Sequence, residues 1–538
     1  MQVQAPPPPE PKLPESGPEP GPAPSAERAS YRSGFFFGTL SFFAVAAAGL
    51  LSTVLTSRLY GVRIIGSFAL VSAPVAAMWV LSTVKEQQAL IKEITQLPAR
   101  HPRVTQLFAV VFLFSSTLTA LVALLDATAC WFVFRGPLNA PQLLAPALVS
   151  IAGYAIVTNT GWNIDSILSA FVAGRQIFWV RVHEVVSFIV IAMLLGLLWH
   201  SVWGLVIATI GASASSLAHR VLAARRFVRA RLSRRELRAG MSALPELLRF
   251  GLRATPGQIA QGASQQGGVW ALGMVAPIYV VGAYSRALTI PARLQQASMR
   301  VTEVLYPTLV GRHSGGDGDG FDRALIDSIR YETIGMLLLA ALIGGAALPI
   351  LEVFGNGFGR ASNALVLLAL YPAFASITVT QTQALWATGR PGRTSVIALV
   401  RLAVTVALLV ALTPSLGVLG PAIALLAGYV VVVVLSGLSL RASLARPLRA
   451  TWPLRERLAL LGAYASAFAA VRAISRALPS LAALPLSLTV GAFLYLAVFV
   501  AFGAVNGRDR ARLSAALRLA RSWRVRRAQR AAARAAAF

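Results

Sequence analysis

The sequence is dominated by apolar segments long enough to cross a lipid bilayer as helices, which need about 20 consecutive, mostly apolar residues. Twelve strongly apolar segments lie near residues 34–56, 64–84, 105–125, 142–162, 184–200, 203–222, 332–351, 363–385, 394–413, 418–438, 458–477 and 484–505. The chain is 56% hydrophobic and only 13% charged, as is typical of membrane proteins. We therefore expect an all-α, polytopic membrane protein.

Two weaker segments, 254–281 and 284–310, bring the expected number of transmembrane helices to about fourteen. The first contains Gln258, Gln261, Gln265 and Gln266, and the second contains Arg286, Arg293, Arg300 and Glu303. A hydropathy window alone would miss both segments and predict twelve spans. An internal repeat favours counting them.

The repeat relates the first part of the chain to the second. IGSFAL at 65–70 aligns with VGAYSR at 281–286, AGRQ at 173–176 with TGRP at 388–391, and WGLVIA at 203–208 with LGPAIA at 419–424. The offsets agree at about 216 residues, which indicates a duplication. Because each repeat has six spans, we expect two parallel six-helix lobes related by an axis along the membrane normal, with a shared cavity between them.

This repeat sets the expected organisation of the chain. The N-terminal lobe covers 34–225 and the C-terminal lobe 254–441, joined by a basic cytoplasmic connector, 226–253. Two additional transmembrane helices follow in 442–505. A Pro-rich tail, 1–33, is expected to be disordered, and the Arg- and Ala-rich tail, 506–538, to lie as an amphipathic helix on the membrane surface.

The distribution of positive charge predicts the orientation in the membrane. The formal net charge is +29, and the arginine-rich connections 85–103, 220–253 and 441–457 fall on the same side as both termini. Cytoplasmic loops carry the excess of Lys and Arg, so we expect both termini in the cytoplasm of a bacterium, contact with anionic lipid and a place in the inner membrane. No basic patch lies on a soluble module, so nucleic acid is not an expected partner.

The stretch 282–310 contains the strongest candidate site. Arg286, Arg293 and Arg300 are seven residues apart, and seven helical residues turn through about 700°, so the three side chains stack on one face. Charges at this depth are costly towards lipid and should face a wet interior. Arg293, nearest the middle, is the best candidate. Glu303 would partly neutralise Arg300. The alternative is that Arg286 and Arg300 snorkel to opposite interfaces.

Other polar residues have two interpretations each. Arg401 is either a second cavity charge or half of a structural pair. Gln258, Gln261 and Gln265 either line the substrate path or form a polar helix seam. Arg58 either contacts the substrate or anchors the membrane interface. The carboxylates of Asp165, Glu184 and Glu303 either couple transport to an ion or proton or belong to structural ion pairs.

Several stretches resemble a known family. They are LTSRLYGVRIIGSFALVS (55–72), LLRFGLRATPGQIAQ (247–261), VGAYSRALTIPARLQQASMRVTEVLYPTL (281–309), LEVFGNGFGRASNALVLLALYPAFASI (351–377) and ALWATGRPGRTS (384–395). They are similar to the polysaccharide transporter (O-antigen flippase-like) branch of the MOP superfamily. The resemblance covers about 34–510 and implies the MOP-type flippase fold.

This resemblance also implies a function. The family carries polyprenyl-pyrophosphate-linked oligosaccharides from the cytoplasmic to the outer leaflet by alternating access, with a cationic cavity between two lobes. The product would be lipopolysaccharide, capsule or exopolysaccharide, with a polysaccharide polymerase and a chain-length regulator as possible partners. The two tails depart from the family pattern.

Other functions remain open. Within the superfamily, the alternatives are a MATE-like multidrug exporter, for which an acidic cavity would be expected, and a lipid II flippase. A polytopic polymerase or ligase is the enzyme alternative, but no catalytic motif or P-loop stands out. The single Cys130 and five scattered histidines show no metal-ligand spacing. We therefore expect a non-enzyme without metal or cofactor.

Overall fold

The computed structural model describes residues 31–84, 86–95, 97–171, 173–228, 234–245, 248, 255–441, 444, 452–478, 481–502 and 509. All regular secondary structure in these residues is helical, so the expected all-α class is confirmed. Ten elements are long and apolar enough to cross a membrane, which indicates a multi-pass membrane protein. The exact number of fourteen crossings stays a prediction.

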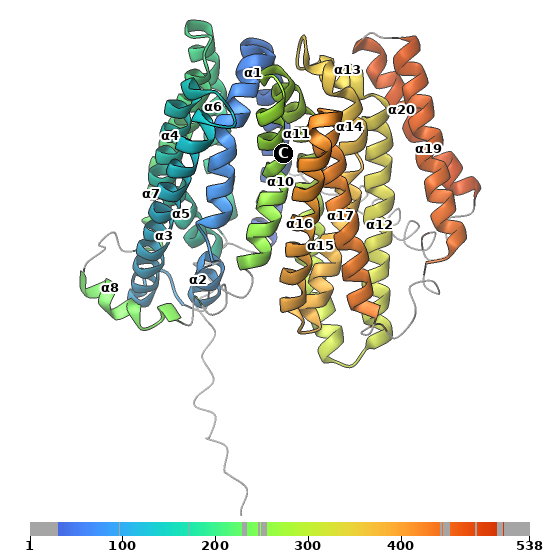
Figure 1. The fold of residues 1–538 in the computed structure, drawn as a ribbon. Helices are drawn as coiled ribbons and strands as arrows, with labels where there is room; N and C mark the ends of the chain where they lie inside the picture. Colours follow the sequence, from blue (N-terminus) through green and yellow to red (C-terminus); the bar gives the residue numbers. More distant parts are fainter. Residues whose placement is uncertain are drawn as a thin grey trace, which may run out of the picture.

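The first half of the described chain forms one group of helices (Figure 1). The elements are α1 (Tyr31–Leu81), α2 (Glu86–Ile94), α3 (Pro102–Arg135), η1 (Pro141–Leu143), α4 (Leu144–Gly153), the π-helical turn η2 (Tyr154–Thr158), α5 (Asn159–Ala170), α6 (Gly174–Leu198), α7 (Val202–Ala224) and the short surface helix α8 (Arg234–Met241). Within this group α6 packs on α7 and α1, and α5 packs on α7.

The remaining helices form a second group. They are α10 (Thr255–Val275), α11 (Ile278–Ser314), α12 (Gly318–Gly345), α13 (Ala347–Glu352), η3 (Phe358–Ala361), α14 (Ser362–Leu368), α15 (Tyr371–Ala387), α16 (Pro391–Leu416), α17 (Leu419–Leu440), α19 (Leu454–Ala477), η5 (Leu481–Ala483) and α20 (Leu484–Ala501). Helices α19 and α20 stand at the outer edge of this group, against α12 (Figure 1). The two groups meet where α1 packs on α10 and α11.

Helix α1 consists of two legs that meet at Gly61. This residue has φ 72° and ψ 168°, a conformation that costs glycine little because it has no Cβ. The first leg runs beside α11, because Gly49 lies against Arg293. The second leg runs beside α10, because Gly262 lies against Val80. The legs therefore correspond to the two separate spans predicted at 34–56 and 64–84.

The repeat is visible in reciprocal contacts between the two groups. A Cβ on Gly66 would lie 2.0 Å from the carbonyl oxygen of Ile278, and a Cβ on Gly282 would lie 2.1 Å from that of Val62. Each member of one contact is 216 positions from its counterpart in the other, which is the offset predicted from the sequence. The repeat thus places two glycines where the second leg of α1 and the start of α11 touch backbone to backbone.

Several helix boundaries differ from the sequence-based prediction. Helix α6 begins at Gly174 rather than near 184, and α12 begins at Gly318 rather than near 332. The additional N-terminal parts of both helices carry charged residues, which lowered their mean hydropathy. Ion pairs neutralise several of the charges in these two helices. The turn between α10 and α11 lies at Ala276–Pro277 rather than 282–283. Proline interrupts the helix there because it has no backbone N–H to donate to the preceding turn.

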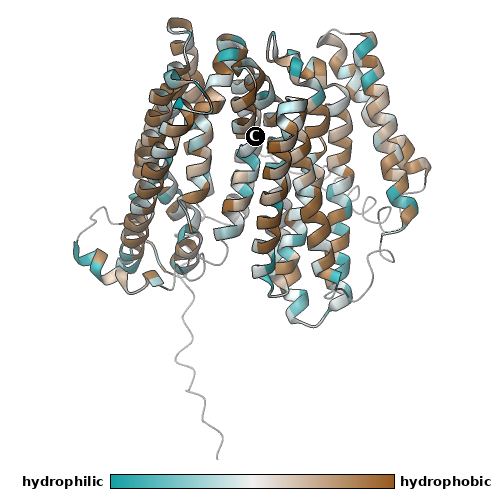
Figure 2. Cartoon of the chain, in the orientation of Figure 1, coloured by the Kyte–Doolittle hydropathy of each residue, from teal (hydrophilic) through white to brown (hydrophobic). Residues whose placement is uncertain are grey.

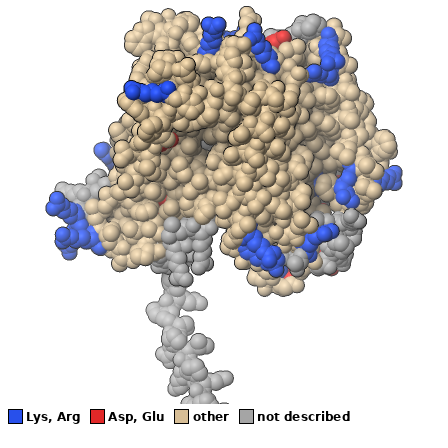
Figure 3. All heavy atoms as spheres, viewed as in Figure 1, with Lys and Arg blue, Asp and Glu red and all other residues tan. Residues whose placement is uncertain are grey.

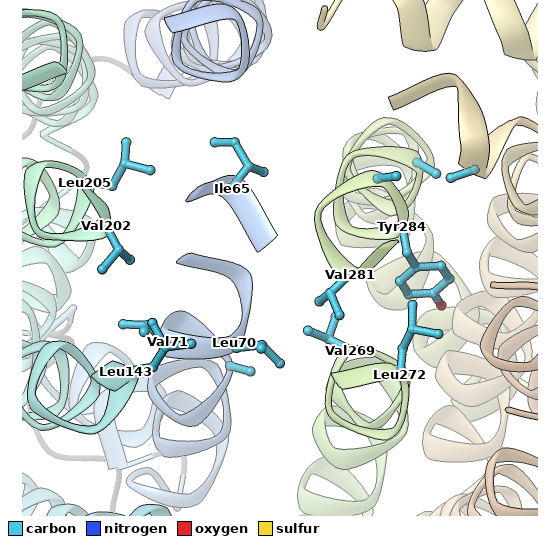
Figure 4. Packing of buried hydrophobic residues seen from close by; sticks show 14 of the residues in the cluster. Ile65, Leu70, Val71, Leu143, Val202, Leu205, Val269, Leu272, Val281 and Tyr284 are labelled. Atoms are coloured by element: carbon cyan, nitrogen blue, oxygen red, sulfur yellow. The ribbon is translucent and has the colours of Figure 1, made fainter. Parts of the chain in front are cut away.

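Charge and hydropathy divide the molecule into bands. In Figure 3 the Lys and Arg side chains gather near the two ends, and the band between them is almost free of charge. Figure 2 shows the helices of this band as mostly hydrophobic. We call the end that carries α8 the basic end and the end that carries Gly61 the far end. In the half of the molecule near the far end, Leu70 of α1 points towards α10 (Figure 4) and lies against Gly273, so apolar packing also joins the groups.

Candidate functional site: the cationic face of α11

Two of the three predicted arginines on α11 face the first leg of α1. The Nε of Arg286 donates a hydrogen bond of 2.7 Å to Oγ of Ser57. Two helical turns further along α11, the guanidinium of Arg293 lies against Gly49. A Cβ on Gly49 would lie 3.6 Å from Nη2 of Arg293. Glycine at 49 therefore leaves room for the Arg293 guanidinium between the two helix groups. The third arginine, Arg300, has its side chain outside the described residues, as has Glu303.

The charges of Arg286 and Arg293 are not neutralised by any described carboxylate. Within the described side chains, Arg293 donates to Oε1 of Gln296 at 3.3 Å and Arg286 to the Ser57 hydroxyl, and neither forms an ion pair. An unpaired cation away from bulk water is costly. An arginine fork in this position is suited to gripping an anionic group such as a phosphate through two hydrogen bonds.

The opposite side of α11 is held in place by a hydrogen-bond network. The side chain of Gln295 donates to the hydroxyl of Tyr429 and accepts from that of Tyr371, each at 3.1 Å. Tyr429 also accepts from Gln265 of α10 at 3.1 Å. These contacts join α11 to α10, α15 and α17. They fix its rotation, so that the arginines, two and nine residues before Gln295, point towards α1.

Of the three predicted glutamines, the structure places Gln265 in this helix seam. Gln261 is exposed, and the side chain of Gln258 lies outside the described residues. Gln295, Tyr371 and Tyr429 were not predicted. Tyr429 could have been noticed as the single polar residue in the run GYVVVVVL, since a buried tyrosine hydroxyl usually has a partner.

Arg401 lies deep in the second helix group and is only 2% exposed. Its guanidinium carbon sits 3.8 Å from the centroid of the Tyr429 ring. Among the described residues, its Nε and Nη2 atoms have no hydrogen-bond partner and no carboxylate pairs with it. Arg401 is stabilised by stacking on the ring of Tyr429. Through this contact it packs against the hydrogen-bond network that Tyr429 forms with Gln265 and Gln295.

Arg58 lies at the far end. Its Nε donates a hydrogen bond of 2.8 Å to the carbonyl oxygen of Val353, in the turn after α13. Gly355 and Gly357 of this turn have positive φ angles and lie beside Arg58 and Val62. Arg58 thus joins the two helix groups at the far end.

Two predicted coupling carboxylates belong to a closed ion-pair network in the first helix group. Asp165 pairs with Arg220 at 3.0 Å and with Arg181 at 2.8 Å. Glu184 pairs with the same two arginines, at 2.8 and 3.3 Å. Arg220 also donates to Ser216 at 2.6 Å. This arrangement fits the structural interpretation of Asp165 and Glu184. No cluster of described His, Cys, Asp and Glu residues is arranged to hold a metal ion.

No protein-family model matches the sequence, and no curated protein matches it either. The fold itself is well represented among solved structures. Its helices, which form two groups that meet at α1, α10 and α11, are similar in arrangement to solved transporters of the MOP superfamily.

Lipid II flippase MurJ in an inward closed conformation superposes with a TM-score of 0.64 at 13% identity, over 87% of this chain and 98% of that one. An inward-facing multidrug resistance MATE transporter gives 0.57 at 15%, over 76% and 94%. A MOP-superfamily transporter from Pyrococcus furiosus, described as having a binding pocket of reverse polarity, gives 0.56 at 16%, over 77% and 96%. At these identities the likeness shows the fold.

Proposed function

We propose that this protein is a flippase that moves polyprenyl-pyrophosphate-linked oligosaccharide from the cytoplasmic to the outer leaflet for polysaccharide biosynthesis. The observation that carries the proposal is the pair Arg286 and Arg293, which face α1 without a described carboxylate partner. By contrast, Arg181 and Arg220 are paired with carboxylates in the first helix group. Positive charge left unpaired between the groups is suited to a substrate that brings its own negative charge.

In this proposal the pyrophosphate is held by Arg293, with Arg286 and Arg300 on the same face of α11. Two-point hydrogen bonds from guanidinium to phosphate are strong in a low-dielectric site. The far end is closed by the Gly66–Ile278 and Gly282–Val62 contacts, so the substrate would enter from the basic end. The two groups would then rock about these helices while the lipid tails stay in the bilayer.

A lipid II flippase is the second candidate, because it has the same pyrophosphate chemistry. The match to MurJ covers 87% of this chain, against 76% for the inward-facing MATE transporter. A MATE-like exporter of cationic drugs is less suited to a basic site. The remaining expectations stay predictions: an inner-membrane location, cytoplasmic termini, anionic lipids and a polymerase and chain-length regulator as partners, and no enzymatic activity.

The test measures the pool of lipid-linked oligosaccharide in a deletion strain complemented with wild type, Arg293→Ala or Arg393→Ala. Arg393 is an exposed arginine at the basic end of α16 and serves as the matched control. We expect undecaprenyl-linked glycan to accumulate in the deletion strain, and wild type and Arg393→Ala to clear it. Arg293→Ala should clear it roughly tenfold more slowly, as the loss of a charge-assisted bond implies.

Three other outcomes would change the proposed substrate, the proposed function or the proposed site. Accumulation of lipid II in the deletion strain would favour the second candidate. Drug sensitivity without any accumulated glycan would contradict the flippase proposal. If Arg293→Ala clears the glycan as well as wild type at equal expression, the flippase survives but its pyrophosphate site does not lie at Arg293.

A further inference from the structure

A groove of about 740 Å³ runs along one face of α6 near the basic end. Its volume lies within the roughly 300–1,000 Å³ typical of small-ligand sites. Its lining includes Arg175, Gln176, Trp179, His183 and Ser187 of α6, with His219 of α7 and Arg226 just after α7. The described lining contains no carboxylate, so its charge is positive.

The groove faces away from the contact between the two helix groups. Helix α6 packs on α1 through Ala192, whose carbonyl oxygen accepts from Tyr60, and through Gly196, which lies against Leu59 and Tyr60. The groove residues lie on a different side of α6. From there an exposed apolar stripe continues towards the far end through Val186, Val190, Leu194 and Leu197. An apolar stripe that runs along most of a transmembrane helix is suited to contact acyl chains.

The groove has positive charge, free helix N–H groups and an exposed indole at the same level near the basic end, and a lipid headgroup is recognised by such groups. Arg175 and Arg226 supply charge at the basic end, and the N–H groups of the first turn of α6, which begins at Gly174, favour an anion. Trp179 is 51% exposed, as is usual for indoles at the membrane interface. The rings of His183 and His219 lie 5.7 Å apart and offer further donors. The neighbouring Arg181 and Arg220 are already paired with carboxylates.

We propose that this groove binds the headgroup of an anionic diacyl phospholipid from the leaflet at the basic end, with an acyl chain along the apolar stripe. The charge of the lining selects the headgroup, and the continuity of groove and stripe selects a lipid over a free anion. This site lies apart from α11 and does not depend on which substrate the protein moves.

The experiment measures lipid binding to the purified full-length protein in detergent by native mass spectrometry. The probes are phosphatidylglycerol, phosphatidylcholine and inorganic phosphate. The variant is Arg175→Gln/Arg226→Gln. The matched control is Arg390→Gln/Arg393→Gln, which removes the same charge at the equivalent corner of the second helix group, where Gly389-Arg390 is the repeat counterpart of Gly174-Arg175.

We expect wild type and the control variant to retain phosphatidylglycerol in preference to phosphatidylcholine. The groove variant should lose affinity for phosphatidylglycerol roughly tenfold or more, with an unchanged elution profile on size exclusion. Equal loss in the control would mean general surface attraction and would overturn the site. Retained binding in the groove variant would overturn it as well, and so would full displacement of the lipid by inorganic phosphate.

Discussion

At the scale of single residues, arginines in this protein occur in two electrostatic settings. Arg220 is 2% exposed and is surrounded by Asp165, Glu184 and Ser216. Arg286 and Arg293 have only neutral described partners. Removing one partner of a buried ion pair leaves an uncompensated charge and destabilises the fold. Removing an arginine that has no carboxylate partner relieves a buried charge instead.

This difference predicts opposite effects on stability. Arg220→Ala should lower the free energy of unfolding by about 3–5 kcal/mol, because Asp165 and Glu184 lose a shared partner. Arg286→Ala should leave it nearly unchanged or raise it. The measurement is thermal unfolding of the detergent-purified protein. Arg181→Ala, whose side chain is 31% exposed, should cost about 1 kcal/mol or less. Equal losses for Arg220→Ala and Arg286→Ala would contradict the distinction between the two settings.

The sequence predicted the arginine face of α11 but not the ion-pair network around Arg220. The seven-residue spacing of Arg286 and Arg293 was enough to predict a shared helix face, because a helix has a fixed period. The network around Arg220 was missed as a unit, since its members come from α5, α6 and α7 and meet only in the folded protein. Asp165 and Glu184 could be recognised as membrane-depth carboxylates, but their partners could not be read from one sequence.

At the scale of helices, the two contact sides of α11 have different tasks. One side presents Arg286 and Arg293 to α1, and the other is tied by Gln295 to Tyr371 and Tyr429. A small rotation of α11 would turn the arginines out of their position. The hydrogen bonds of Gln295 therefore position the candidate site without touching a substrate themselves.

Tyr429→Phe tests this positioning role. It removes the hydroxyl that accepts hydrogen bonds from Nε2 of Gln265 and Nε2 of Gln295, and the loss of hydrogen bonds at a buried site costs about 1–3 kcal/mol. The matched control is Tyr495→Phe, which removes a buried hydroxyl that donates to the carbonyl of Ile334 at 2.8 Å, far from α11 in the chain. We expect both variants to lose stability, and only Tyr429→Phe to clear lipid-linked glycan more slowly. Similar transport by both variants would argue against a positioning role.

The contact of the two repeat-related glycines gives a second prediction at this scale. Gly66→Ala should push the second leg of α1 away from α11, because the new Cβ would lie 2.0 Å from a carbonyl oxygen. Gly282→Ala should do the same from the other side. Ser57, which is 1% exposed, reports the change when replaced by cysteine in a Cys130→Ala background.

We expect Ser57→Cys to be protected from a membrane-impermeant thiol reagent, and to react once either glycine is replaced. Gly335→Ala is the control, because a Cβ there meets nothing within 4 Å. Protection that persists in both Gly66→Ala and Gly282→Ala would show that the contact does not close the far end.

The sequence predicted the equivalence of these two glycines but not their contact. The offset of about 216 residues aligned Gly66 with Gly282, whereas the close approach of the two backbones is known only from the structure. The ends of α6 and α12 were misplaced because hydropathy treats every charge as exposed, whereas a paired charge can continue a helix into the membrane. Segments such as 1–30 and 510–538 lie outside the described residues, so the predicted tails remain predictions.

At the scale of the whole molecule, the two helix groups touch at the far end through backbone contacts, one loop and apolar side chains such as Leu70. Besides the glycine contacts, Arg58 reaches Val353, and Gly357 lies against Val62. A transporter that alternates its access must break these contacts in every cycle, so preventing their separation should stop transport without unfolding the protein.

A disulfide between Val62→Cys and Gly357→Cys tests this directly. A Cβ on Gly357 would lie 3.7 Å from Cβ of Val62, within the usual range of about 3.5–4.5 Å for a disulfide. We expect oxidation of the double variant to stop clearance of lipid-linked glycan and a reductant to restore it. The positive φ at Gly357 strains the new cysteine, so Gly357→Cys alone is assayed for its own effect.

The control disulfide joins two helices of the same group. Gly257→Cys/Ser395→Cys links α10 to α16, where the corresponding Cβ distance is also 3.7 Å. Because these helices belong to one group, this bond should form without stopping transport. If the Val62–Gly357 disulfide forms and transport continues, the far end does not need to open. The proposal that the two helix groups rock against each other would then be wrong. If both disulfides stop transport, the movement lies within the second group rather than between the two groups.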